Sequence, residues 1–319
     1  MSELLSIVAP LCNEEGNVTL LVQGIREVLD GKNIPFEVIL VDDGSSDGTF
    51  ARIKSEALHD NRVTGLRLSR NQGQTTAIKA GMEHAGGAVC ITMDGDLQHD
   101  PRHIPDFLSK INEGFDLVCS YRHGRKDALT RRLPSRAANW VARIFSGLQI
   151  RDFGSTYRAY RTAIAKDIPI YGEMHRFIPV FMKMRTERIT EIPITVEPRR
   201  YGHSNYGLGR TFRVFADLVA ILFFARFFSR PIHIFGYISL ILGFPGLAIL
   251  GWLSAAKLAG HIRIMDYGPM FMLGVLLCLV AVQMLTTGIV CEYLVRIYYG
   301  GTEKKSYIVV EKISREDHE

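Results

Sequence analysis

The sequence has few cysteines, and none at a spacing that indicates a disulfide framework or a zinc site. Its five cysteines form no C-x-x-C pair and lie mostly within apolar runs: Cys12, Cys90, Cys119, Cys278 and Cys291. Disulfide-rich secreted domains and zinc modules carry cysteines in closely spaced pairs. We therefore expect a protein that works in a reducing cytosol.

The amino terminus also lacks the features of a secretory leader. Residues Met1 to Leu5 contain no basic start and no long apolar core before a strand-like run begins. We expect the N-terminal part of the chain to stay in the cytosol. The sequence shows no internal repeat and no low-complexity tract.

There is no strong excess of one charge. The chain has 38 Lys and Arg against 33 Asp and Glu, for a formal net charge of +5. Dedicated nucleic-acid binders usually carry a larger and more clustered basic excess, so nucleic acid is not an expected partner. The balance is compatible with anionic substrates or an anionic membrane surface.

A regular alternation of short apolar runs and amphipathic stretches extends from Leu4 to Val118. This pattern is typical of β-α units that build a mostly parallel, Rossmann-like sheet. We predict strands at residues 5–10, 36–42, 63–68, 88–93 and 116–120, with a further strand near 189–197. We predict helices at residues 17–30, 48–58, 74–85 and 103–113.

Two long runs near the C-terminal end contain no Asp, Glu, Lys or Arg: Pro231 to Ala256 and Tyr267 to Cys291. About twenty helical residues span the roughly 30 Å of a bilayer's hydrocarbon core. A buried helical hairpin of a soluble protein is the alternative, but two such runs joined by a short loop favour two transmembrane helices. Positive charge gathers outside the pair, which predicts that both ends are cytosolic in an inner membrane: Arg226, Arg230, Arg296, Lys304 and Lys305.

These features predict four parts of the chain. Residues 1–206 form the α/β domain, residues 231–293 the two-helix transmembrane anchor, and residues 294–319 a cytosolic tail. Residues 207–230 mix arginines with Phe, Leu and Val, a composition suited to helices that lie at a membrane surface. Within the tail, residues 306–312 alternate like a short strand, but the sequence does not identify its partner.

The strongest chemical signal is Asp94-Gly95-Asp96, followed by Leu97 and Gln98, at the end of the predicted strand 88–93. Ligands bind beyond the carboxyl ends of the strands in open parallel sheets. Two carboxylates there can hold a hard divalent ion against a diphosphate, and Gln98 can supply a third oxygen. The same tripeptide also makes a good turn, so a simple turn stays open as an alternative.

Two other strand ends carry polar side chains. In Val41 to Thr49, Asp43 is placed to accept hydrogen bonds from a base or ribose, whereas Asp47 or Thr49 can cap the next helix. The segment Ala9 to Glu15 closes the first strand with Asn13 and Glu14 at the same edge. An ordinary polar βα loop is the alternative for this segment.

Together these residues resemble family 2 glycosyltransferases of the GT-A fold. The resemblance rests on Pro10 to Glu15, Val41 to Thr49, Arg70-Asn71-Gln72-Gly73 and Asp94-Gly95-Asp96-Leu97-Gln98-His99-Asp100-Pro101. More narrowly, the chain looks like the branch of dolichol-phosphate mannose synthases and undecaprenyl-phosphate glycosyltransferases, which also carries a two-helix anchor. That branch moves a sugar from a nucleotide diphosphate onto a polyprenyl phosphate.

The resemblance implies roles for particular residues. Pro10, Asn13, Glu14 and Asp43 would line the nucleotide pocket, and Asp94, Asp96 and Gln98 would surround Mg²⁺ or Mn²⁺. The segment Arg199 to Ser204 matches the family's R-x-x-G-x-S pattern, so Arg199 would contact the donor diphosphate. The expected catalytic residues are thus Asp94, Asp96 and Arg199. The sequence departs from the family at Leu11-Cys12, where an aromatic residue is frequent, and at Asn205, where lysine is common.

Arginines gather in an aperiodic loop predicted at Tyr121 to Arg136. A phosphate nucleophile is already ionised at neutral pH, so it needs guanidinium groups for positioning more than it needs a general base. Similar enzymes use such a loop for the acceptor phosphate, and we expect Arg122, Arg131 and Ser135 to bind it. A solvated basic loop near an anionic membrane is the alternative.

Two other functions compete with this prediction. A processive polysaccharide synthase would show a Q-x-x-R-W segment and more membrane spans, which the sequence does not contain. A non-catalytic membrane protein that binds nucleotide sugars would not need the complete set of Asp94, Asp96, Gln98 and Arg199. The sequence leaves open the sugar, the choice between UDP and GDP, and the number of subunits, a homo-oligomer included.

Overall fold

The computed structural model describes residues 4–122, 143, 147–168, 170, 174–196, 231–260, 262–300 and 309–313. The chain divides into two compact units. The first is Met1–Leu222 together with Lys305–Glu319, and the second is Phe223–Lys304.

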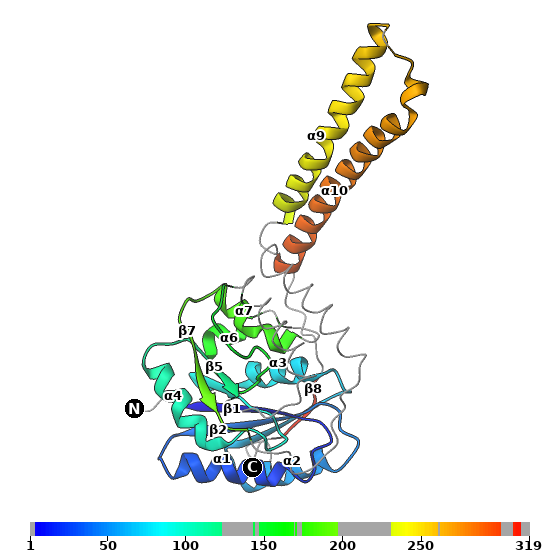
Figure 1. Ribbon diagram of the computed structural model, residues 1–319. Coiled ribbons are helices and arrows are strands. Elements are labelled where there is room, and N and C mark those ends of the chain that lie inside the picture. The colour runs from blue at the N-terminus through cyan, green and yellow to red at the C-terminus, as the bar shows by residue number, and fades with distance from the viewer. Residues whose placement is uncertain are drawn as a thin grey trace. The chain divides into compact units, whose positions relative to one another are not determined.

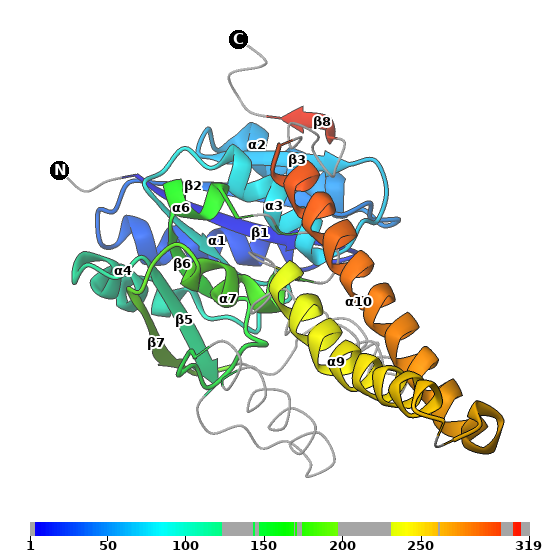
Figure 2. The ribbon, with the colours of Figure 1, turned by 90° about the horizontal axis from the view of Figure 1, so that it is seen from above.

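The first unit is built on an eight-stranded sheet in the order β7-β5-β6-β4-β1-β2-β3-β8, with β7 and β8 at its two edges (Figures 1 and 2). Strands β1 to β5 and β7 run parallel, whereas β6 and β8 are antiparallel to their neighbours. The strands are β1 (Leu5–Leu11), β2 (Phe36–Asp42), β3 (Val63–Leu68), β4 (Val89–Thr92), β5 (Leu117–Arg122), β6 (Arg158–Arg161), β7 (Ile189–Ile194) and β8 (Val309–Ile313).

Helices cover both faces of this sheet (Figure 1). Among the described residues of the first unit, the α-helices are α1 (Val18–Asp30), α2 (Thr49–His59), α3 (Gln74–His84), α4 (Ile104–Asn112), α6 (Thr162–Lys166) and α7 (Ile178–Lys183). Two short 3-10 helices accompany them, η1 (Pro101–His103) and η2 (Met174–Phe177).

The core follows from the alternation of side chains along the strands. In β1, Leu5, Ile7 and Ala9 join the buried residues of α1, α2 and α4 in one apolar cluster. Val8 points to the opposite face, where α3 packs so closely that a Cβ on Gly81 would lie 2.3 Å from a Val8 methyl carbon. Helix α3 therefore lies on the opposite face of the sheet from α1 and α2.

The strands and helices predicted between residues 5 and 120 are confirmed with shifts of one or two residues at their ends. The predicted loop from Tyr121 begins too early, because β5 continues to Arg122. Tyr121 and Arg122 pair with Pro193 and Ile194 of β7, and this neighbour extends the strand. Strand β6 was not predicted from the sequence, since its four residues carry no clear alternation.

The tail strand has a partner that only the fold reveals. Strand β8 pairs with β3, with Gly65 opposite Ile313. Lys54 of α2 forms an ion pair with Glu311 of β8 at 3.7 Å. Ile313 is 3 % exposed and belongs to the core cluster. The C-terminal strand thus completes the core and covers the edge of β3.

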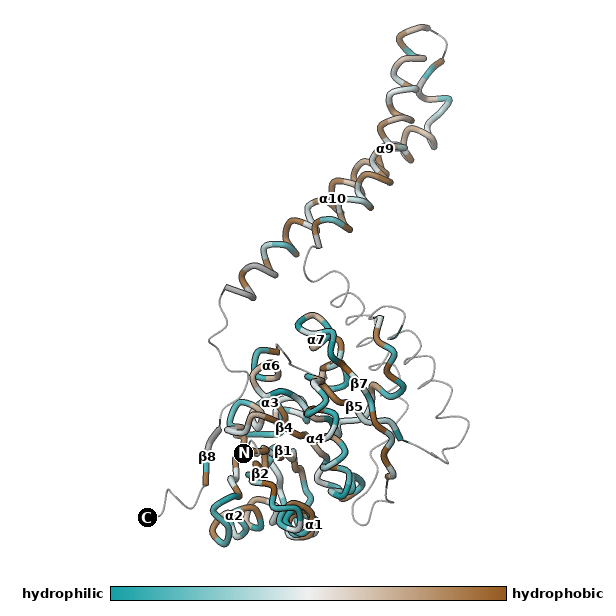
Figure 3. Tube along the Cα trace, turned by 90° about the vertical axis from the view of Figure 1, so that its left-hand side faces the viewer, coloured by the Kyte–Doolittle hydropathy of each residue, from teal (hydrophilic) through white to brown (hydrophobic). Residues whose placement is uncertain are grey.

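The second unit contains α9 (Pro231–Leu258), η3 (Ile264–Tyr267) and α10 (Gly268–Gly300). Two stretches are long and apolar enough to cross a membrane, Ile232–Leu258 and Met265–Leu294, and little of their surface is buried within the described residues. Apolar residues run along both helices (Figure 3). The helices approach each other at glycines, since a Cβ on Gly246 would lie 3.0 Å from the Gly274 carbonyl oxygen.

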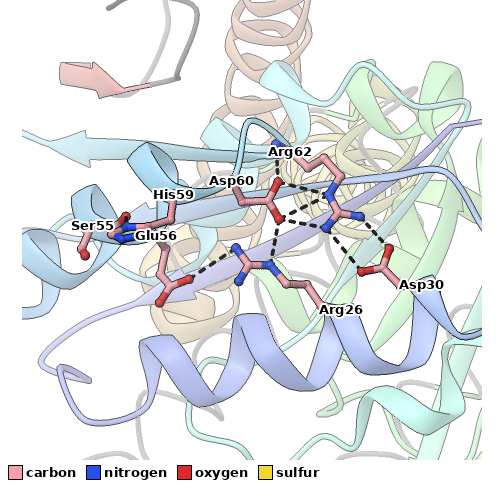
Figure 4. A network of polar contacts seen from close by, with 7 residues as sticks. All are labelled: Arg26, Asp30, Ser55, Glu56, His59, Asp60 and Arg62. Atoms are coloured by element: carbon pink, nitrogen blue, oxygen red, sulfur yellow. Dashed lines mark hydrogen bonds and ion pairs between the residues drawn. The ribbon is translucent and has the colours of Figure 1, made fainter.

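An ion-pair network joins the end of α1 to the loop between α2 and β3 (Figure 4). Asp60 accepts hydrogen bonds from Arg26 at 2.8 Å and from Arg62 at 2.9 Å, and Arg62 also bonds to Asp30 at 2.6 Å. Burial alone would raise the pKa of Asp60, but the hydrogen bonds from Arg62 and the nearby positive charges outweigh it and lower the pKa below 3.8.

Replacing Ile313 with Ala should lower the free energy of unfolding by about 2–5 kcal/mol, because it leaves a cavity in the core. Thermal unfolding of the full chain in detergent measures this loss. Leu58→Ala, at a side chain that is 42 % exposed on α2, is the matched control and should have little effect. An equally small effect at Ile313 would contradict the core position of β8.

Replacing Asp60 with Asn should cost about 1–2 kcal/mol of stability at neutral pH, since solvent partly screens the arginines. The folded-state pKa of Asp60 is depressed, so its contribution is present above pH 3.8 and is lost as the pH falls through the folded-state value. The difference between wild type and variant should therefore shrink below pH 3.8. Unfolding measured from pH 7 to pH 3 tests this, with the more exposed Asp30→Asn as the control for a weaker pair.

Candidate active site

The chain changes direction across the sheet between β1 and β4. Strands β1, β2 and β3 follow one another outward, and then α3 crosses the opposite face to place β4 on the other side of β1. Such a switch point opens a crevice at the carboxyl ends of the strands, where α/β proteins bind their ligands. The loops after β1, β2, β3 and β4 all begin at this edge. Together with the end of β1 they carry these predicted donor and metal residues: Pro10, Asn13, Glu14, Asp43, Asp94, Asp96 and Gln98.

The loops after β1 and β2 are tied together by hydrogen bonds. Asn13 adopts a left-handed backbone conformation, with φ of 57°, which asparagine tolerates better than most residues. Its side-chain oxygen accepts a hydrogen bond from the backbone N–H of Ser46 at 2.9 Å, and its backbone N–H donates to Ser45 Oγ at 2.9 Å. The Glu14 amide donates to Thr49 Oγ1 at 2.8 Å. Asn13 and Glu14 therefore orient this loop pair at the crevice.

Asp43 joins the loop after β2 to the loop after β3. Its two carboxylate oxygens accept hydrogen bonds from the backbone N–H of Gln72 at 2.7 Å and from the backbone N–H of Gly73 at 2.9 Å. Burial raises the pKa of Asp43, and these two amides offset part of that rise. Each carboxylate oxygen can accept a second hydrogen bond, so the same group can also bind a nucleoside.

Gly44 explains why these two loops can pack so closely. Its φ is 65°, and an added Cβ would lie 2.5 Å from the backbone of Arg70 and Asn71. No side chain other than hydrogen fits there without moving the backbone. The spacing of Asp43 and Gly44 in the sequence thus reflects a close approach between two loops.

The loop after β4 presents the predicted metal residues. Asp94 Oδ1 accepts hydrogen bonds from Gln74 Nε2 at 2.7 Å and from Thr156 Oγ1 at 2.6 Å. Asp96 is 6 % exposed, and its Oδ1 accepts a hydrogen bond from the backbone N–H of Gln98 at 3.1 Å. This bond helps to form the tight turn that also places Leu97 at a φ of 60°.

Gly95 brings this turn against the end of β1. A Cβ at Gly95 would lie 2.3 Å from a Leu11 methyl carbon and 3.1 Å from the Pro10 carbonyl oxygen. The predicted donor residue Pro10 is therefore adjacent to the Asp94–Asp96 turn. The turn interpretation of this tripeptide is confirmed, and the metal role of its two carboxylates stays a prediction that the turn does not exclude.

His99 forms a hydrogen bond with the backbone of the Asp94–Asp96 turn, and it was not among the predicted site residues. Its Nδ1 accepts a hydrogen bond from the Asp94 amide at 3.0 Å, which leaves the proton on Nε2, 3.9 Å from Asp94 Oδ2. The ring stacks on Tyr157 with centroids 4.9 Å apart. Burial lowers the pKa of His99, although Asp94 and Asp96 oppose this shift.

The predicted acceptor residue Arg122 ends β5. Its Nε donates to Asp152 Oδ2 at 2.8 Å, and the Gly154 amide donates to Asp152 Oδ1 at 2.9 Å. The other predicted phosphate contacts, Arg131, Ser135 and Arg199, lie outside the described residues.

His175 and Arg158 have structural partners. His175 is 3 % exposed, and its Nδ1 lies 2.9 Å from Thr75 Oγ1 at the start of α3. The fully buried Arg158 donates to the carbonyl oxygens of Phe153 and His175 at 2.8 Å and 2.7 Å. His175 therefore connects η2 to the start of α3, and Arg158 connects η2 to the segment before β6.

Asp94, Asp96 and Gln98 offer only oxygen atoms as ligands, which suits Mg²⁺ or Mn²⁺ better than softer metals. Within the described ranges, no group of three or more His, Cys, Asp and Glu is arranged to hold a metal. Two carboxylates and one amide oxygen are fewer oxygen ligands than Mg²⁺ needs, so substrate phosphates and water would complete its coordination.

Comparison with known proteins places the chain in a family. The sequence profile of Glycosyl transferase family 2 matches residues 6–170. The chain is 40 % identical over 313 residues to a dodecaprenyl-phosphate galacturonate synthase of Rhizobium johnstonii, covering 96 % of this chain and 91 % of that protein. It is 30 % identical over 309 residues to an undecaprenyl-phosphate 4-deoxy-4-formamido-L-arabinose transferase of Salmonella choleraesuis, covering 97 % and 93 %.

Solved structures agree on the fold. Glucosyl-3-phosphoglycerate synthase of Mycobacterium tuberculosis, in complex with phosphoglyceric acid, superposes with a TM-score of 0.57 at 19 % identity, covering 70 % of this chain and 80 % of that one. The same enzyme with Mn²⁺, UDP-glucose and phosphoglyceric acid gives a TM-score of 0.56 at 18 % identity, covering 70 % and 79 %. The predicted GT-A fold is confirmed, and the chain belongs to glycosyl transferase family 2.

Proposed function

We propose that this enzyme transfers a sugar from a nucleotide diphosphate donor, a UDP- or GDP-hexose, to a polyprenyl phosphate such as undecaprenyl or dolichyl phosphate. The observation that carries the proposal is the Asp94-Gly95-Asp96 turn beside the end of β1, at the switch point of the sheet. Two relatives that match nearly the whole chain are named for sugar transfer to polyprenyl phosphates.

The donor would lie across the four loops at the carboxyl edge of the sheet. Pro10, Asn13, Glu14 and Asp43 would surround the nucleoside, and Arg199 would contact the diphosphate. Asp94, Asp96 and Gln98 would hold Mg²⁺ or Mn²⁺, which when bound neutralises negative charge on the departing diphosphate. The hydrogen bonds that Asn13 and Asp43 make between neighbouring loops support this placement, because they hold the loops in position before the donor binds.

The acceptor phosphate would be positioned by Arg122, Arg131 and Ser135. One of its oxygens attacks the anomeric carbon, the bond from that carbon to the donor phosphate breaks, and the nucleotide diphosphate leaves from the opposite face with inversion. No proton has to be removed from the nucleophile, since a phosphate monoester is ionised at neutral pH. The ion pair of Arg122 with Asp152 supports this role, because it orients the guanidinium at the end of β5.

Membrane attachment fits a lipid acceptor. Residues 231–293 would form a two-span anchor, with residues 207–230 at the membrane surface. The catalytic domain, residues 1–206, and the tail, residues 294–319, would lie on the cytosolic side of the inner membrane. The hydropathy and length of α9 and α10 support the anchor.

A donor panel tests the proposed reaction directly. Labelled UDP- and GDP-sugars are incubated with the full chain and undecaprenyl phosphate, with and without EDTA, and product is scored by extraction into organic solvent. UDP-galacturonate is the first donor to test, because the relative at 40 % identity is named for galacturonate. Metal-dependent extraction of label with one donor is the expected result, and no transfer with any donor would refute the proposal.

Replacing Asp96 with Ala should reduce transfer by about 100-fold or more, because it removes an expected metal ligand. The extraction assay at saturating donor and lipid measures the loss. Asp106→Ala is the matched control, since the Asp106 side chain is 64 % exposed on α4, and it should retain full activity. Full activity in Asp96→Ala would remove this residue from the metal site.

Replacing Arg131 with Ala should raise the apparent KM for the lipid by about tenfold and change the KM for the donor much less, because one charge-assisted contact to the acceptor phosphate is lost. Steady-state kinetics with each substrate varied separates the two effects. Arg188→Ala, at an exposed arginine just before β7, is the control. An unchanged lipid KM in Arg131→Ala would argue against the acceptor role of this residue.

A further inference from the structure

Asp94 is oriented by two side chains from distant parts of the chain. Gln74 is the first residue of α3, and Thr156 lies two residues before β6. A carboxylate accepts hydrogen bonds and cannot donate them, so Gln74 Nε2 at 2.7 Å and Thr156 Oγ1 at 2.6 Å are both donors to the same atom, Oδ1. Neither residue belongs to the predicted ligand set.

Thr156 is itself firmly fixed. The Thr92 hydroxyl, at the end of β4, donates to the Thr156 carbonyl oxygen at 2.5 Å. The preceding Ser155 Oγ lies 2.6 Å from Ser120 Oγ in β5. Thr156 is 5 % exposed and Thr92 is 1 % exposed, so water does not compete well for these bonds.

Gln74 is anchored through its neighbour. Thr75 Oγ1 lies 2.9 Å from His175 Nδ1, and it also accepts a hydrogen bond from the His175 amide at 3.2 Å. This contact joins the start of α3 to η2. The side-chain amide of Gln74 thus extends toward Asp94 from a helix end that is held against η2.

The two carboxylate oxygens of Asp94 differ in the number of hydrogen bonds that they accept from the described residues. Oδ1 has two hydrogen-bond donors, one for each lone pair. Oδ2 has no hydrogen-bond donor among the residues that the structure describes, and His99 Nε2 is 3.9 Å away. The Asp94 side chain is 29 % exposed, so a ligand can reach it from solvent.

We propose that Gln74 and Thr156 are positioning residues that hold the Asp94 carboxylate so that Oδ2 is presented to the metal–diphosphate of the donor. This inference rests on the proposed function. Groups that orient a metal-binding carboxylate typically change metal affinity or activity by about 10–100-fold when they are removed. Their effect here is on orientation, because neither side chain needs to touch the donor.

The test measures Mn²⁺ affinity as well as turnover. Thr156→Val and Gln74→Met remove each donor and nearly keep the side-chain shape. Calorimetric titration of Mn²⁺ into the full chain in detergent, saturated with whichever of UDP or GDP the wild type binds, should show affinity about 10–100-fold weaker in each variant. The kcat/KM for the donor should fall to a similar degree, with the lipid KM unchanged.

Matched controls lie elsewhere in the first unit. Thr186 Oγ1 donates to Asp116 Oδ2 at 2.5 Å beside the start of β5, and Gln23 Nε2 donates to Glu27 Oε1 at 2.9 Å on α1. Thr186→Val and Gln23→Met therefore remove the same kinds of bond at other carboxylates. Both should keep wild-type Mn²⁺ affinity.

The conservative variant Thr156→Ser retains the hydroxyl and should stay within about twofold of wild type, whereas Thr156→Val should not. Equal losses in Ser and Val variants, or wild-type Mn²⁺ affinity in both Thr156→Val and Gln74→Met, would overturn the positioning role and leave the proposed function intact. If the wild type binds no Mn²⁺ with either nucleotide, the metal assignment fails and this inference fails with it, whereas the proposed transfer reaction is refuted only by the donor panel. Gln74 is half-buried, so Gln74→Met should impair folding less than Thr156→Val. If Thr156→Val does not fold, wild-type Mn²⁺ affinity in Gln74→Met overturns the positioning role, and weaker affinity there with near wild-type affinity in Thr156→Ser supports it.

Discussion

The candidate site depends on one constraint, which is that the carboxyl ends of β1 and β4 lie side by side, although the chain reaches β4 through α3 on the opposite face of the sheet from α1 and α2. Helix α3 must cross above β1 for this to happen, and its close contact at Gly81 and Val8 shows how tightly it lies on the sheet. The crossing opens the crevice and also delivers Gln74, at the start of α3, to Asp94. The same helix therefore sets the topology of the sheet and supports the carboxylate at its edge.

Acidic side chains gather at this edge, and the protein fixes each of them with directional donors. Asp43 accepts hydrogen bonds from two amides, Asp94 from two side chains, and Asp96 from the Gln98 amide. Unpaired carboxylates in a crevice would repel one another and resist burial. These donors reduce that cost, and a cation bound at the proposed metal site would reduce it further.

The C-terminal strand gives the catalytic unit a second dependence on chain segments that are distant in sequence. Strand β8 follows the apolar helices in the sequence and then pairs with β3, where Ile313 enters the core. The loop after β3 supplies the amides of Gln72 and Gly73 to Asp43. A strand that lies beyond α9 and α10 in the chain thus covers β3, and the loop after β3 contacts Asp43.

Much of this molecule could be predicted from local sequence, because apolar alternation and turn residues act over a few positions. Strands β1 to β4, helices α1 to α4, both long apolar helices and the acidic turn after β4 all follow from such short-range signals. The positions of β6 and of the partner of β8 could not, since antiparallel pairing joins residues about 70 or more than 200 positions apart. For the same reason the sequence pointed to Asp94 but not to Gln74, Thr156 or His99, whose roles arise only when α3, the segment before β6 and the turn after β4 fold against one another.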